Sequence, residues 1–160
     1  ALGNSMSSYT AQNVGAGKTD RIKQGVKALY IISLVITLPL FISFFFFPEY
    51  MMRIFIDTNN SEIINCGTEF LKTVSPFYLF ISIKLIIDGV LRGSGVMNLF
   101  MISTFSDLLL RVLLCYTLTP FYDANGIWYS WPAGWLLATV ISCLFYFTGT
   151  WKKKINNLTK

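Results

Sequence analysis

The chain has 160 residues, of which 54% are hydrophobic, 16% aromatic and only 13% charged, with a formal net charge of +5. Soluble domains usually carry about twice this share of charged residues, so water is excluded as the solvent for most of the chain. The basic residues stand at the ends of apolar blocks, which does not fit a nucleic-acid partner. The chain has no histidine and offers no pattern typical of a metal site, a cofactor or an enzyme.

The apolar residues fall into blocks that predict transmembrane helices, since about 20 helical residues cross a bilayer. Residues 1–14 are mildly polar and are expected to be the end of a helix that packs against protein. Four complete spans are predicted at about 28–47, 74–91, 96–118 and 126–146, the second with an amphipathic lead-in from Ser61. The prediction is an all-α membrane protein with four complete transmembrane helices and the end of a fifth.

Glycine, proline and polar residues mark the expected connections between these helices. The turns are predicted at Gly15 and Gly17, Pro48, residues 57–60, Gly93 and Gly95, and Pro120 with residues 123–126. The pair Gly89 and Gly93, four residues apart, also permits the close approach of a neighbouring helix. The first residue is Ala1 and no signal peptide follows it, so we expect the N-terminal part of a longer protein to be missing.

Lysine and arginine predict the orientation of the helices, because the cytoplasmic loops of membrane proteins are enriched in both. Nine of the 13 basic residues lie in three regions: the connection that follows residues 1–14, the turn at Arg92 and the C-terminal tail. Asp20 is the single acidic residue of these regions. Successive spans alternate sides, so these three regions share one face of the membrane. We therefore expect this face, and with it the C-terminus, to be cytoplasmic.

Four charged residues remain inside the predicted spans, and two of them lie near the middle of the third span. Asp107 and Arg111 are four residues apart, so they share one helix face and are expected to make contact. An unpaired charge at this depth costs at least about 3 kcal/mol. Two interpretations stay open: the pair belongs to a proton or cation pathway, or it is a static salt bridge that fixes helix packing.

Lys84 and Asp88 repeat this spacing on the second span, nearer to its cytoplasmic end. The Lys84 side chain is long enough to reach towards the interface, and Asp88 is also four residues away from Arg92. One interpretation is a ladder of charges anchored at the interface. The alternative makes Asp88 a carboxylate that exchanges ions.

Aromatic residues are concentrated within the spans, and three of them are candidates for a substrate cavity: Phe77, Tyr78 and Tyr116. Aromatic rings bind flat organic cations by stacking and by cation–π contact. The alternative interpretation is that these rings face lipid or pack against neighbouring helices.

Three segments, in this order, resemble the multidrug and toxic compound extrusion (MATE) transporters. They are QNVGAGKTDRIKQG (residues 12–25), DGVLRGSG (88–95) and GIWYSWPAGW (126–135), the last followed by YFTGTWKKK (146–154). The resemblance implies twelve helices in two six-helix lobes, of which this chain supplies part of the C-terminal lobe while the N-terminal lobe is missing. It also implies a multi-pass protein of the bacterial plasma membrane, surrounded by lipid, that exports cationic, amphipathic compounds by antiport with sodium or protons.

The resemblance implies a functional role for only a few residues of this chain. Asp107 and Arg111 look like a charged pair found in the eleventh helix of many bacterial members, and they are the first candidates for ion coupling. Asp88 and Lys84 follow, although a lysine at position 84 departs from the pattern of a sodium site and leaves the coupling ion open.

Two other functions fit the helix pattern. A flippase for lipid-linked precursors belongs to the same wider superfamily, but its cavity carries more cationic residues than the spans of this chain contain. A membrane scaffold that transports nothing is the third hypothesis, and the charges of Asp107 and Arg111 within a span argue against it.

Overall fold

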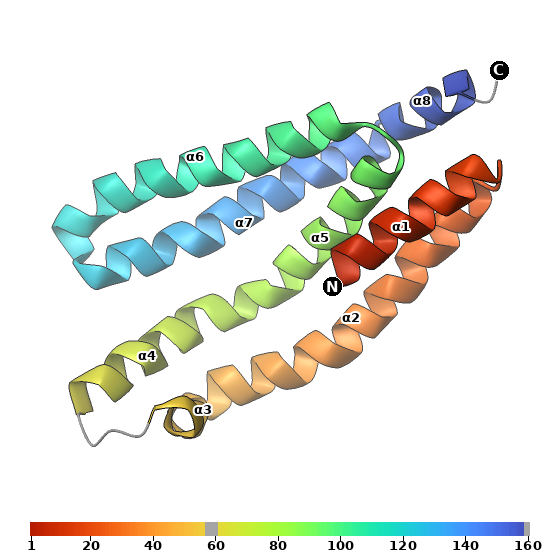
Figure 1. Cartoon of the computed structure of the whole chain (residues 1–160). Coiled ribbons are helices and arrows are strands. Elements are labelled where there is room, and N and C mark those ends of the chain that lie inside the picture. The colour runs from red at the N-terminus through yellow and green to blue at the C-terminus, as the bar shows by residue number, and fades with distance from the viewer. Residues whose placement is uncertain (57–60, 159–160) are drawn as a thin grey trace.

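The computed structural model describes residues 1–56 and 61–158, and all regular elements in these ranges are helical (Figure 1). In chain order they are α1 (Leu2–Gly15), α2 (Asp20–Phe46), α3 (Pro48–Phe55), α4 (Ser61–Val74), the short 3-10 helix η1 (Ser75–Phe77), α5 (Tyr78–Gly93), α6 (Met97–Tyr122), α7 (Ala124–Phe147) and α8 (Thr150–Leu158). The predicted all-α fold is confirmed. The turn predicted at residues 57–60 lies outside the described residues.

Four helical stretches are long and apolar enough to cross a membrane: Asp20–Phe46, Ser61–Gly93, Met97–Tyr122 and Ala124–Phe147. Each covers one predicted span to within one residue and extends beyond it. The second stretch joins α4, η1 and α5 into 33 residues, so the amphipathic lead-in from Ser61 continues directly into the apolar helix. Helical hydrogen bonding does not stop where hydrophobicity stops, and polar residues at the ends prolong the helices past the apolar core.

The connection between α6 and α7 is tighter than predicted, and the expectation that Pro120 forms part of a turn is wrong. Pro120 lies inside α6, and the chain reverses at Asp123, whose backbone φ is 48°. A proline this close to a helix end disturbs few hydrogen bonds. Gly126 makes the tight reversal possible, because a Cβ atom at this position would lie 2.6 Å from the backbone of Leu118.

Helix α5 lies at the centre of the bundle. In Figure 1 the α6–α7 hairpin covers one side of α5, while α1 and α2 cover the other. Within the span Ser61–Gly93, 56% of the most apolar window is buried, against 11% in α2 and 11% in α6. The two outer helices therefore present their apolar side chains on the surface, as membrane-facing helices do.

Glycines set the distance between α1 and α5. A Cβ atom at Gly89 would lie 2.6 Å from the carbonyl oxygen of Gly3, and one at Gly3 would lie 2.8 Å from the carbonyl oxygen of Leu85. A side chain at Gly93 would likewise collide with the backbone of Ser7. The predicted close approach at Gly89 and Gly93 is confirmed, and α1 is the helix that uses it.

The C-terminal tail, which the sequence marked only as basic, forms α8 and packs against the bundle. Trp151 and Ile155 on α8 are buried in one apolar cluster with Met6 of α1, Ile22 of α2 and Val90 of α5. This cluster brings the α1–α2 connection, the end of α5 and α8 to the same end of the bundle (Figure 1).

Candidate functional site

Lys84 and Asp88 form an ion pair inside the bundle. Both lie on α5, one helical turn apart, and the Lys84 Nζ atom is 2.5 Å from Asp88 Oδ2. Their side chains are 6% and 2% exposed, respectively. Burial removes both charges from solvent, so each needs the other as a counter-charge.

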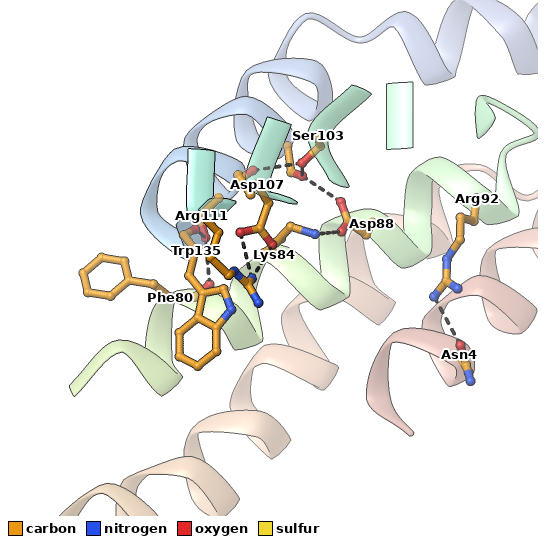
Figure 2. Close-up of polar contacts among 12 residues, drawn as sticks. Asn4, Phe80, Lys84, Asp88, Arg92, Ser103, Asp107, Arg111 and Trp135 are labelled. Carbon is orange, nitrogen blue, oxygen red and sulfur yellow. Dashed lines mark hydrogen bonds and ion pairs between the residues drawn. The ribbon is translucent and has the colours of Figure 1, made fainter. Parts of the chain in front are cut away.

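A chain of hydroxyl groups ties this pair to the α6–α7 hairpin. Ser142 on α7 donates a hydrogen bond of 2.7 Å to Asp88 Oδ1, and its Oγ atom lies 2.7 Å from the Oγ of Ser103 on α6. Because Ser142 has one hydroxyl proton and gives it to Asp88, Ser142 Oγ accepts from Ser103, whose single proton is shared between Ser142 and the carbonyl oxygen of Ala138. Ser103 also contacts the carbonyl oxygen of Ala138 at 3.1 Å (Figure 2). The Asp88 carboxylate on α5 is thereby linked to α7 through Ser142 and to α6 through Ser103.

Asp107 and Arg111 form the second ion pair, on α6. One guanidinium nitrogen of Arg111 lies 2.9 Å from each carboxylate oxygen of Asp107. Gly134 on α7 leaves room for the Asp107 carboxylate, because a Cβ atom there would collide with Asp107 Oδ1. Asp107 is one turn beyond Ser103, so both side chains leave the same face of α6, towards α7.

Aromatic rings of α7 and its neighbours continue from Arg111. The Arg111 guanidinium carbon lies 4.8 Å from the centre of the Trp131 ring, a cation–π contact. Trp131 contacts Trp135 at 5.9 Å between ring centres, and Trp135 contacts Tyr78 at 6.1 Å. Phe70 on α4 contacts Trp131 edge to face, with 6.4 Å between the ring centres. A row of rings therefore connects α4, η1–α5 and α7 beside the Asp107–Arg111 pair.

The contact predicted between Asp107 and Arg111 is confirmed. Of the two partners that the spacing allowed Asp88, the structure pairs it with Lys84 and not with Arg92. Lys84 reaches to Asp88, one turn further along α5, and stays buried. Arg92 instead donates to Asn4 Oδ1 on α1 at 3.2 Å (Figure 2). Its guanidinium group also lies over the Phe100 ring. The reason is the close packing of α1 on α5, which supplies Arg92 with a neutral acceptor and leaves Asp88 to Lys84.

The three aromatic candidates do not form one group. Tyr78 contacts Trp135 and also Phe44 of α2, and Phe77 lies next to it and contacts Phe80. Tyr116 lies on α6 and is 82% exposed, on the outer surface of the bundle. Only Phe77 and Tyr78 are near the row of rings.

Sequence reasoning missed Ser103, Ser142, Trp131 and Trp135 as parts of this region. The spacing of Ser103, four residues before Asp107, was a usable signal, because it places a hydroxyl on the helix face that carries the carboxylate. The spacing of four residues between Trp131 and Trp135 was also a usable signal, because it puts both rings on one side of a helix. Nothing in the sequence connects Ser142 with Asp88.

A hollow borders the buried Lys84–Asp88 pair. A hollow of about 290 Å³ is lined by Lys84, Asp88, Arg92, Asn4 and Thr104, among others, so the buried pair borders space for water or a small ion. Among the residues that the structure describes, no group of three or more histidine, cysteine, aspartate or glutamate side chains is placed to hold a metal ion.

Four apolar spans around paired charges define a multi-pass membrane protein. Residues 1–117 match the MatE family, and the chain belongs to this family.

Curated relatives of the chain are bacterial. It is 27% identical over 143 residues to the probable multidrug resistance protein NorM of Thermotoga maritima, covering 88% of this chain and 30% of that protein. It is 26% identical over 153 residues to the probable multidrug resistance protein YpnP of Bacillus subtilis, covering 95% and 34% of the two chains. The chain thus spans about a third of the length of these relatives. No solved structure matches it.

Proposed function

We propose that this chain forms part of the C-terminal lobe of a secondary transporter that exports cationic, amphipathic compounds by antiport with sodium or protons. Membership of the MatE family and relatives named as multidrug resistance proteins support the transporter class. The N-terminal lobe would supply the other wall of the cavity. A second lobe is consistent with the comparison, because the chain spans about a third of the length of its relatives.

The observation that carries the proposal is the Lys84–Asp88 pair and its bridge through Ser142 and Ser103 to the neighbouring helices. The Asp88 carboxylate accepts from the Lys84 ammonium group and from the Ser142 hydroxyl at the same time. A cation or proton that binds Asp88 competes with both of these donors. Binding would therefore change the contacts between α5 and the α6–α7 hairpin, which is the coupling that an antiporter needs.

The row of rings beside Arg111 supports an aromatic surface for the exported compound. Trp135 contacts Trp131, the ring under the Arg111 guanidinium group, and Tyr78 contacts Trp135 in turn. Such rings attract the cationic and flat parts of a substrate. Phe77 and Tyr78 are therefore proposed to border the cavity, and Tyr116, which lies on the outer face of α6, would reach substrate only if the other lobe covers that face.

The distribution of basic residues supports a location in the bacterial plasma membrane with the C-terminus in the cytoplasm. The α1–α2 connection, the turn between α5 and α6, and α8, which carry most of the basic residues, lie at one end of the bundle, while α3 and the start of α4 lie at the other (Figure 1). The excess of positive charge marks the cytoplasmic end.

The test is transport by the full-length protein that contains this chain. The protein is reconstituted into liposomes, and export of a fluorescent organic cation is followed under an imposed sodium gradient or an imposed proton gradient. We expect export with one of the two gradients and a strong loss in Asp88→Asn. Correctly inserted protein that moves no organic cation under either gradient would contradict the proposal, and a lipid-linked precursor would then be tested as the substrate.

A further inference from the structure

We propose that the end of the bundle formed by α8 and the α1–α2 connection binds the headgroups of anionic phospholipids. The binding surface, here called the basic collar, consists of seven exposed basic side chains: Lys18, Arg21, Lys23, Lys27, Lys152, Lys153 and Lys154. The inference rests on the position and surroundings of these side chains, and it holds whether or not the protein is an antiporter.

The basic collar is fixed in place because α8 is anchored. Trp151 is only 1% exposed, its ring stacks on Tyr146 at 5.5 Å, and its indole nitrogen donates to the Tyr146 carbonyl oxygen at 3.0 Å. One turn later, Ile155 is also 1% exposed and joins the same cluster as Ile22 of α2. Residues 152–154 lie between these two anchors and are exposed. The lysines therefore belong to a docked helix and not to a free tail.

Within the described residues, the charges of the basic collar are not balanced by acidic side chains. Asp20 is the acidic residue of this region, and it stands against seven bases. The ion pairs of the described residues join Arg53 to Glu49, Lys84 to Asp88 and Arg111 to Asp107, and none of them includes a residue of the collar. A dense, uncompensated positive surface attracts anions from its surroundings.

The position of the basic collar next to an apolar surface indicates which anions it would bind. On α2 the charged segment ends at Lys27, and the exposed residues that follow are apolar, including Tyr30, Ile31 and Ile32. The collar thus borders the surface that faces the lipid tails, at the level where phosphate headgroups lie. Phosphate oxygens accept charge-assisted hydrogen bonds from lysine and arginine. Single-stranded nucleic acid is less suited, because Trp151, the aromatic residue beside the lysines of α8, is buried and cannot stack on a base.

The experiment measures which lipids the full chain retains. The chain is purified in micelles that contain equal amounts of phosphatidylglycerol and phosphatidylcholine, and bound lipids are counted by native mass spectrometry. We expect a preference of about fivefold or more for phosphatidylglycerol, falling with added salt. The triple variant Lys152→Gln, Lys153→Gln, Lys154→Gln should lose most of this preference, and the corresponding arginine variant should keep it.

The matched control removes charge from the opposite end of the bundle, in the double variant Arg53→Gln, Lys72→Gln. This variant should keep the wild-type preference. Equal retention of both lipids by the wild type, a preference that salt does not change, or an equal loss in the control variant would each overturn the proposal. The salt dependence of the wild type decides the question even if the triple variant does not fold.

Discussion

Asp88 on α5 and Ser142 on α7, 54 positions apart in the chain, are joined by a hydrogen bond of 2.7 Å from the hydroxyl to the carboxylate. This bond connects the central helix to the α6–α7 hairpin inside the membrane-spanning part of the bundle. Since Asp88 is also paired with Lys84, the hydrogen bond and the ion pair share one carboxylate and support each other.

Replacing Ser142 by alanine should therefore destabilise the chain by about 1.5–3 kcal/mol, because it removes a buried donor to a charged group. The measurement is the midpoint of unfolding in detergent micelles. Ser130→Ala is the matched control, since Ser130 is equally buried but bonds only to the Ile127 carbonyl oxygen of its own helix. Equal losses in the two variants would show that the link to Asp88 contributes nothing specific.

Breaking the ion pair on one side should cost more than removing it completely. Lys84→Met leaves Asp88 charged and buried without its counter-charge, a loss of about 3–5 kcal/mol. The double variant Lys84→Met, Asp88→Leu removes both charges and should recover a large part of this loss. Unfolding of the wild type, both single variants and the double variant gives the coupling energy of the pair. Additive effects would mean that the two side chains do not interact.

A single methyl group at Gly89 should loosen the packing of α1 on α5. The added Cβ atom of Gly89→Ala would lie 2.6 Å from the carbonyl oxygen of Gly3, so the helices have to separate, at a cost of about 1–3 kcal/mol. Gly15→Ala serves as the control, because no atom lies within 4 Å of the place that its added methyl group would take. The stability of both variants in micelles is compared, and a neutral Gly89→Ala would contradict the close approach.

In the full-length protein, Asp107→Asn should impair coupled export more than Asp123→Asn. The first substitution leaves the Arg111 charge inside a span without its partner, whereas Asp123 is exposed at the reversal between α6 and α7. Asparagine has the same size and shape as aspartate, so that variant changes the charge and leaves the turn in place. The initial rate of organic-cation export in liposomes is the readout. Equal rates in the two variants would remove Asp107 from the candidates for ion coupling.

Much of the fold could be read from the sequence because the relevant signals are local. Apolar blocks of sufficient length predicted all four spans, and the spacing of four residues predicted the contact of Asp107 with Arg111. The glycines at 89 and 93 indicated a close helix contact. The α8 helix was not predicted, since Trp151 and Ile155, which the structure shows to face inwards, stand among polar neighbours in the sequence.

The sequence by itself determined which residues are charged inside the membrane and which of them share a helix face, because helix geometry repeats over four residues. It left Asp88 with two possible partners at equal spacing, Lys84 and Arg92. The tertiary structure decided between them: α1 packs on α5 and offers Asn4 to Arg92, and α7 brings Ser142 to Asp88. Contacts between helices depend on how distant segments pack, and no local spacing in the chain encodes them.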